Sequence, residues 1–278
     1  MRCFRGCVGY CVLILASPVC LAVELTKEAV DGWDRYILTT EAKLESRFRG
    51  EGMFLGPQDS PAWRQQLRNH TTLVYPSVPK GVVSIKGGLI QDWSGAVFVP
   101  NSSLKQVLSI VQDYDHHKAI YKPDIAEAKL RSRSGDNFNV FMRIVKSKLM
   151  LSAVLNTDHD IRFTTLDSHR VFSRAYCRRI AEVSGAGKQG EHELPVGQDH
   201  GYIWRITGYW FFEERDSGVY ISCQSITLTR DIPFLLEKVL GPVLRELPGE
   251  SLRLSLEQTR NAITALAAPP PVSPLPKE

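Results

Sequence analysis

The residues best suited to chemistry lie in one short stretch, DYDHHKAIYKP at positions 113–123. Two adjacent histidines beside two acids are residue types found in zinc sites and in acid–base pairs. A zinc pair on one helical face needs a spacing of about four residues, whereas His116 and His117 are neighbours that point in different directions. Both would instead suit the end of a helix, where the helix dipole favours positive charge. We predict this structural role for them.

Other acid–histidine pairs fall in stretches that are typical of turns or of a polar loop. They are Asp158-His159-Asp160, Asp167 with His169, Glu191-His192-Glu193 and Asp199-His200. Aspartate is common in turns because its side chain bonds to nearby backbone groups. Nothing in these spacings requires a metal, so we expect no metal and no cofactor.

Nucleophile and nucleotide motifs are missing from the chain. It has no Gly-x-Ser-x-Gly elbow, no phosphate-binding glycine loop and no dinucleotide fingerprint. Cys177 precedes two arginines, but neighbours in a strand face opposite ways, so a packed thiol is expected. An enzyme built on this chain would need inward-facing polar groups, for which Arg143, Tyr176 and Glu213 are candidates.

The aromatic run GYIWRITGYWFF at positions 201–212 carries the strongest functional signal. Strand alternation places its two tryptophans, 204 and 210, on one face, which then needs a deep apolar partner from the last helix. An ordinary core would use the same residues, because large aromatics dominate cores. The functional interpretation is a ligand cavity. Its predicted lining is Trp204, Ile206, Trp210, Leu252, Leu256 and Ile263.

Hydrophobic periodicity predicts the elements that would position these residues. Residues 24–50 carry apolar side chains such as Trp33 and Leu44 about every three to four positions, which indicates an amphipathic helix. Residues 82–100 are rich in β-branched and aromatic residues and predict strand, with glycines at a bend. A helix over 104–111 follows, behind cap candidates at 101–103.

The remainder predicts a long β-meander and a final helix. Turn residues lie at 134–137, 157–160 and 216–218, and a polar loop over 184–200 is either a lid or a flap. Pro248-Gly249 is expected to break the helical pattern before a terminal amphipathic helix.

The N-terminus has the pattern of a secretory signal, with Arg2 and Arg5 ahead of an apolar run and small residues before Glu24. We expect cleavage after Ala22, and the alternative is an uncleaved anchor. Removal of the two arginines lowers the formal net charge from +4 to +2, which is too small for a nucleic-acid partner. The mature chain keeps Cys177 and Cys223, either as a pair or as two buried thiols.

Residues 89–125, LIQDWSGAVFVPNSSLKQVLSIVQDYDHHKAIYKPDI, resemble the opening of START-like domains of the SRPBCC helix-grip superfamily, in its coenzyme Q-binding and polyketide-cyclase-like branch. In that family a strand leads into a helix that ends in an Asp-aromatic turn, with a proline before the next strand. Residues 97–100, Asp113-Tyr114 and Pro123 match this order. Residues 201–233 are similar to uncharacterised exported bacterial members.

The resemblance covers about residues 82–267 and implies an α+β helix-grip fold, in which a curved antiparallel β-sheet wraps around a long C-terminal helix. It also implies an apolar cavity between sheet and helix. We expect a signal at 1–22, an N-terminal helical extension at 23–79, the START-like domain at 80–267 and a disordered Pro-rich tail at 268–278.

The expected function is that of an exported bacterial protein, periplasmic or secreted, that binds a hydrophobic small molecule such as a lipid, an isoprenoid quinone or a polyketide-like compound. Contact with a membrane would be transient, and no nucleic acid is expected. Two alternatives are a cyclase- or hydrolase-type enzyme on the same fold, and an envelope interaction module that uses the N-terminal helix and holds no ligand.

Overall fold

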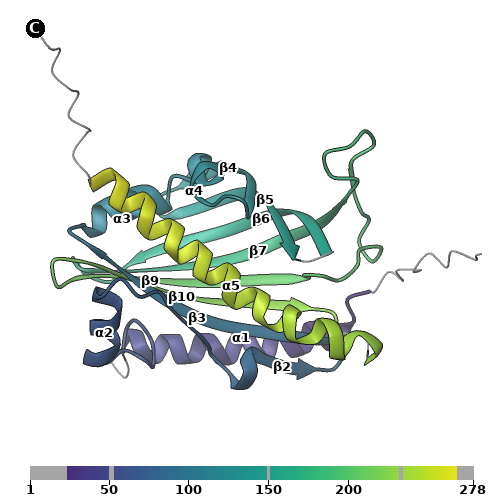
Figure 1. Ribbon diagram of the computed structural model, residues 1–278, viewed down its shortest axis with the longest axis horizontal. Coiled ribbons are helices and arrows are strands. Elements are labelled where there is room, and N and C mark those ends of the chain that lie inside the picture. The colour runs from purple at the N-terminus through teal and green to yellow at the C-terminus, as the bar shows by residue number, and fades with distance from the viewer. Residues whose placement is uncertain (1–23, 50–52, 149–150, 232–233, 268–278) are drawn as a thin grey trace, which may run out of the picture.

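The computed structural model describes residues 24–49, 53–148, 151–231 and 234–267 (Figure 1). The helices are α1 (Lys27–Phe48), α2 (Pro61–Arg68), α3 (Leu104–Val111), α4 (His117–Ile120) and α5 (Phe234–Ala267), with 3-10 turns at Pro79–Gly81 and Tyr114–His116. The strands are β1 (Leu73–Pro76), β2 (Val82–Ile85), β3 (Gly88–Pro100), β4 (Ile125–Ser134), β5 (Asn137–Lys148), β6 (Leu151–Thr165), β7 (Arg170–Ser184), β8 (His192–Glu193), β9 (Arg205–Arg215) and β10 (Gly218–Thr229). The expected signal and tail lie outside the described residues.

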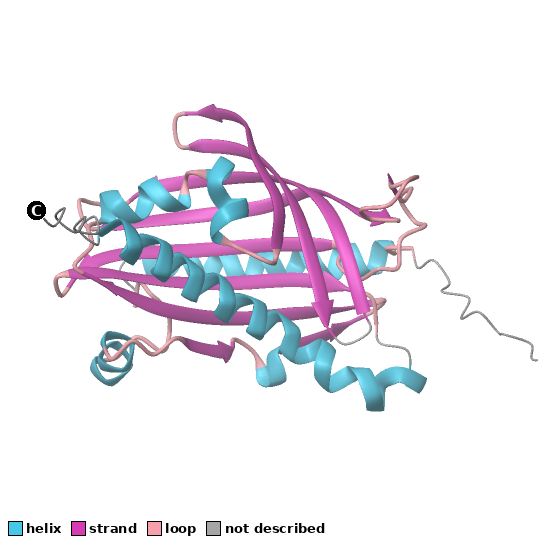
Figure 2. Cartoon of the chain, turned by 45° about the horizontal axis from the view of Figure 1, so that its top comes forward, coloured by secondary structure: helices cyan, strands magenta, loops and turns pink. Residues whose placement is uncertain are grey.

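The strands form an antiparallel sheet in the order β1-β3-β10-β9-β7-β6-β5-β4, with β2 on β3 and β8 on β7. This sheet curves around α5, which crosses it diagonally, while α1 lies on the other side (Figures 1 and 2). We call the side of α5 the concave face and the side of α1 the convex face. The arrangement confirms the predicted helix-grip fold.

Local sequence signals account for several of the connections. Ser103 and Gln106 form a capping box at the start of α3, in which each side chain bonds to the other residue's backbone. The β9–β10 turn has Asp216 and Ser217 at φ of 57° and 58°, a left-handed pair typical of two-residue hairpins. Arg68 of α2 donates to Asp216 at 2.8 Å and so ties this turn to the helical layer.

A core cluster lies on each face of the sheet. On the concave face, side chains of β3, β9 and β10 such as Val97, Phe212 and Ile221 pack with Leu256 of α5. The alternate positions of the same strands point to the convex face, where they meet α1 and α2. The main members of the convex cluster are Trp33, Leu44, Trp63, Leu67, Phe98, Phe172, Tyr209, Phe211 and Tyr220.

Polar contacts fix α1 on the convex face. The Tyr36 hydroxyl donates to the buried carboxylate of Asp92 at 2.7 Å, and Tyr209 donates to Glu41 at 3.1 Å. Burial raises the pKa of Asp92. The predicted extension 23–79 also supplies β1, which pairs with β3. This N-terminal region therefore contributes to the sheet as well as to its cover.

The turn predicted at 157–160 is wrong, because these residues lie inside β6. His159 is the register partner of Val140 on β5 and of Cys177 on β7, so both neighbours hydrogen-bond to this stretch. The β6–β7 pairing shifts its register by a β-bulge between Asp158 and His159. Pairing on both sides overrides the turn preference of the aspartates.

The interruption expected at Pro248-Gly249 is also absent, since α5 runs unbroken from Phe234 to Ala267. Gly249 has a packing role there: a Cβ at this position would lie 2.7 Å from the Trp93 ring, so only glycine allows the helix to approach the indole this closely. Within the described residues, no helix has the length and hydropathy needed to span a membrane.

The packing of α1 leads to a stability prediction. Leu44 is 0% exposed and Leu38 is 66% exposed on the same helix. Leu44→Ala should lower the free energy of unfolding by about 2–5 kcal/mol, because it leaves a cavity in the convex cluster. Leu38→Ala, the matched control, should change it by less than about 0.5 kcal/mol. Urea unfolding measures both, and equal small effects would mean that α1 does not cover the sheet in solution.

Candidate ligand-binding site

The concave face is only partly covered. Among the described residues, α5 packs mainly on β3, with smaller contacts to β1 and β10. Several side chains on this face are left half-buried. We call this set the concave strip: Trp93, Met142, Ala175, Ile206, Gly208, Trp210 and Ser225.

Small residues lie side by side in the middle of the strip. Ser225, Gly208 and Ala175 are register partners on β10, β9 and β7, and Trp93 of β3 continues the row. A Cβ at Gly208 would find only Trp210 Nε1 at 3.8 Å and Ala175 Cβ at 4.0 Å within van der Waals reach. The middle of the row therefore has room on its concave side for additional atoms.

Trp210 and Ile206 flank this row on β9. Both are half-buried, and the Trp210 ring stacks on Phe212 with centroids 6.3 Å apart. Trp210 thus joins the concave cluster on one side while part of its indole stays accessible. Two of the six residues predicted to line a cavity lie together in the strip.

The three predicted residues of α5 belong instead to the closed part of the core. Leu252, Leu256 and Ile263 are 5%, 0% and 1% exposed. The fit is tight here, since a Cβ at Gly95 would lie 2.8 Å from a Leu256 methyl carbon. These side chains anchor α5 on β3, so the accessible apolar surface lies beside this part of the helix and not beneath it.

Trp204 lies on the opposite face from Trp210, so the predicted pairing of the two indoles is wrong. Trp204 is 5% exposed in the convex cluster, and its Nε1 donates to Asp199 at 3.2 Å. The reason is that β9 begins at Arg205, one residue later. Strand alternation therefore does not extend back to position 204.

The concave face also holds a buried polar pair on β6. Thr157 donates its hydroxyl hydrogen to the Met142 carbonyl at 2.8 Å, so it accepts from His159 Nε2 at 2.9 Å. Burial lowers the pKa of His159 to about 4, and the imidazole is neutral at neutral pH. Cys177 donates to the Arg179 carbonyl at 3.1 Å, and burial raises the pKa of its thiol to about 12, which opposes a nucleophilic role.

The three acid–base candidates point to the convex face and are engaged there. Arg143 pairs with Glu191 at 2.8 Å, Tyr176 donates to Glu41, and Glu213 accepts from Arg64 at 2.8 Å. None of them faces the concave strip.

The two adjacent histidines of residues 113–123, His116 and His117, have different environments. His116 is exposed and bonds to Asp113 at 2.8 Å, which raises its pKa. His117 is buried between the rings of Tyr114 and Tyr121, with centroids 4.8 and 4.9 Å away. No group of metal-ligating side chains occurs in the part of the chain that the structure describes.

Cys177 and Cys223 are both free and buried. They lie on β7 and β10, which β9 separates, so the structure shows two buried thiols and not a pair.

The 184–200 loop lies against the convex side of the sheet. Arg179 pairs with Glu193 at 2.8 Å, as Arg143 does with Glu191, and Asn156 donates to Glu193 at 2.8 Å. These contacts do not place the loop over the concave strip.

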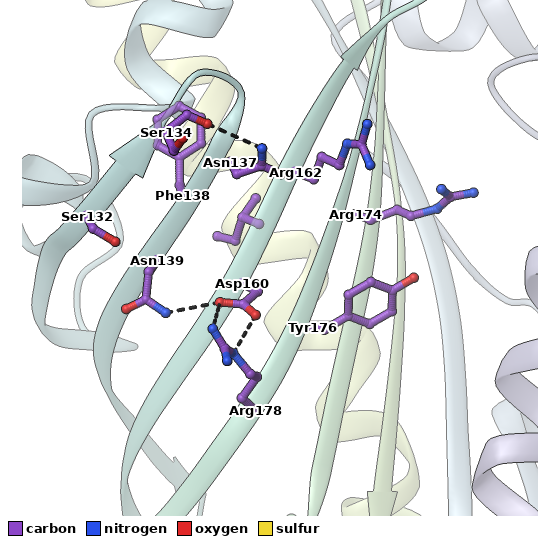
Figure 3. A pocket seen from close by; sticks show the side chains of 11 residues that line it. Ser132, Ser134, Asn137, Phe138, Asn139, Asp160, Arg162, Arg174, Tyr176 and Arg178 are labelled. Atoms are coloured by element: carbon purple, nitrogen blue, oxygen red, sulfur yellow. Dashed lines mark hydrogen bonds and ion pairs between the residues drawn. The ribbon is translucent and has the colours of Figure 1, made fainter.

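Two hollows of the described surface lie outside the concave strip. One, of about 320 Å³, is on the convex face of β4–β7 (Figure 3). The other, of about 420 Å³, lies at the ends of strands near Asn101 and Ser217. The six residues predicted to line a cavity belong to neither of them.

No family model and no curated protein matches the chain. Among solved structures, it is similar to a fragment of the STAR-related lipid transfer protein from Xanthomonas axonopodis, with 13% identity, 69% of this chain and 98% of that chain covered, and a TM-score of 0.45. It is also similar to a START superfamily protein from Mycobacterium smegmatis, with 14% identity, coverage of 63% and 98%, and a TM-score of 0.41. It is similar as well to the Zhui aromatase/cyclase from a Streptomyces species, with 10% identity, 64% of this chain and 96% of that chain covered, and a TM-score of 0.41. These values describe a partial overlap of folds and say nothing about a ligand.

The burial of His117 predicts a pH-dependent stability. Burial lowers its pKa from 6.5 to about 4. The unfolded chain therefore takes up the proton first, and this contribution to stability is complete above pH ~6.5 and lost as the pH falls towards ~4. At pH 5 the loss is about 2 kcal/mol relative to pH 8.

His117→Phe should remove this part of the pH dependence, measured as the free energy of urea unfolding at pH 8 and pH 5. His116→Phe, at the exposed neighbour, should retain it. An unchanged difference between the two pH values in the His117 variant would contradict the assignment.

Proposed function

We propose that this chain is a binding protein for a hydrophobic small molecule, which lies on the concave strip beside α5. The observation that carries the proposal is the half-buried state of Trp210, Ile206, Ala175 and Met142 around a row of small residues. Apolar side chains of a sheet that is otherwise covered on both faces are expected to be fully buried. A patch that remains accessible and apolar is typical of a ligand site.

The chemistry of the strip favours an apolar ligand. Most of its side chains are apolar, and its polar atoms are the Ser225 hydroxyl and the indole nitrogens of Trp93 and Trp210. Thr157 and Cys177 beside it already donate to backbone carbonyls. Burial of a hydrocarbon chain contributes about 0.8 kcal/mol per CH₂ group. A chain of about ten carbons would therefore reach useful affinity through burial alone.

Export is the second part of the proposal, and its support is the basic and apolar pattern of residues 1–22. An exported carrier of this kind would meet membranes only transiently, when it loads or releases its ligand.

Filling the row of small residues in the concave strip should weaken binding. Gly208→Val adds methyl groups where a Cβ meets only ordinary contacts, and valine suits a strand, so the fold should be retained. Affinity for 11-(dansylamino)undecanoic acid, measured by dansyl fluorescence, should fall at least about tenfold, because about two CH₂ groups of the probe lose their place.

Ser84→Val, at an exposed site on β2, is the control and should bind as the wild type does. The proposal would be abandoned if wild type failed to bind the probe, or if Gly208→Val bound it equally well.

The two indoles on opposite faces provide a second, independent readout. A brominated C16 fatty acid quenches tryptophan only at close range, so bound ligand should quench Trp210. Trp210→Phe should lose a clear part of this quenching, with the remainder coming from Trp93 of the strip, and Trp204→Phe should keep all of it. The reverse result would place the ligand on the convex face.

The proposed export is tested on the protein from its own host. N-terminal sequencing of the mature form should begin at Val23 if cleavage follows Ala22. A chain that still begins at Met1 and fractionates with membranes would indicate an anchor instead.

A further inference from the structure

The convex hollow lies on the opposite face from the concave strip. Most of its lining comes from the alternate positions of β4–β7 that point away from α5, and Phe138 and Ile161 of the concave cluster complete it (Figure 3). Serines and asparagines of the β4–β5 hairpin form one wall, and three arginines, Arg162, Arg174 and Arg178, form the other. This lining is rich in hydrogen-bond donors, in contrast to the apolar strip.

Two of these arginines stand directly opposite each other. Arg162 of β6 and Arg174 of β7 are register partners, so both side chains leave the sheet on the same face and at the same level. Like charges in this arrangement destabilise a sheet. A pair of this kind calls for a compensating negative charge.

The carboxylates nearby compensate only part of this charge. Arg174 pairs with Glu45 of α1 at 2.6 Å, and Arg178 pairs with Asp160. Within the described residues, no carboxylate pairs with Arg162, whose side chain is exposed at the rim of the hollow. One full positive charge therefore remains without a counter-charge.

Donors also outnumber acceptors in the hollow. The Asp160 carboxylate already accepts from Asn139 at 3.0 Å and from Arg178 at 2.7 Å. Arg174 Nε is buried and has no acceptor. An acceptor-rich group beside Arg162 and Arg174 would offset the like-charge pair and supply acceptors to the exposed Arg162 guanidinium.

We infer that the convex hollow binds a phosphate group, held between Arg162 and Arg174. A phosphate carries up to two negative charges and several acceptor oxygens, which suits a surface where two register-paired arginines bring one uncompensated positive charge. The group would be either free phosphate or the phosphate of a lipid head group. Its recognition is independent of the concave strip and of the function proposed for it.

The test compares wild type with Arg162→Gln in phosphate-free buffer, in phosphate, and in chloride of equal ionic strength. Phosphate should raise the melting temperature of wild type beyond the chloride effect and give a measurable heat of binding. Arg162→Gln should bind phosphate at least about tenfold more weakly, because it loses charge-assisted hydrogen bonds.

Arg133→Gln is the matched control. It removes the same charge from an exposed arginine of β4 that lies outside the hollow and donates to the Gly135 carbonyl. It should bind phosphate as wild type does. Equal loss in both variants would show a net-charge effect and overturn the inference, as would the absence of any specific phosphate effect on wild type.

Stability without phosphate separates binding from a structural role. Because Arg162 faces a like charge, Arg162→Gln should be at least as stable as wild type in phosphate-free buffer. A clear loss of stability there, with an unchanged phosphate response, would overturn the inference.

Co-sedimentation with vesicles identifies the source of the phosphate. If wild type prefers phosphatidic acid vesicles over phosphatidylcholine vesicles and Arg162→Gln loses this preference, the ligand is a lipid head group. If the protein binds inorganic phosphate but not the vesicles, the ligand is the free anion.

Discussion

Strands β9 and β10 carry large side chains at consecutive positions because a helical layer lies on each face of the sheet. Tyr209 and Phe211 belong to the convex cluster with α1, while Trp210 and Phe212 lie on the concave face with α5. A sheet that is covered on one face only needs apolar residues at every second position, and a sheet covered on both needs them throughout. The places where this requirement is relaxed are therefore informative. The concave strip is half-exposed but apolar, and the outer strands β4–β6 are polar on their convex side.

The parts of the fold that were predictable from the sequence are those with local causes. Ser103 and Gln106 cap α3 through contacts three residues apart, and Asp216-Ser217 forms a two-residue turn. The predicted helix over 104–111 and the turns at 134–137 and 216–218 are confirmed for this reason. Strand, helix and meander in that order also suffice to indicate a helix-grip fold.

The parts that were not predictable depend on pairing between distant segments. The row of Ser225, Gly208 and Ala175 exists only through the register of three strands, and none of these residues stands out within its own strand. The same holds for Arg162 and Arg174, which are twelve positions apart in sequence and opposed in space. His159 looks like part of a turn because its neighbours are aspartates, whereas in the sheet those aspartates pair with arginines such as Arg131 and Arg178 on the convex face. Trp204 shows that strand alternation cannot be extended past the end of a strand: β9 begins one residue later, and the indole lies on the convex face.

The convex cluster joins segments that lie far apart in the sequence. Glu41 of α1 bonds to Tyr209 of β9, a separation of 168 residues. Helix α1 is thus among the first segments to leave the ribosome, whereas β9 and β10 of the convex cluster are the last strands to do so. Early strands can meet α1 first, since Ile85 of β2 lies next to Gly32 and Asp92 of β3 bonds to Tyr36, but the long loop to β9 must close before the convex cluster is complete. The convex cluster is therefore completed only after most of the chain has been synthesised, and until then part of the apolar face of α1 is exposed to other chains.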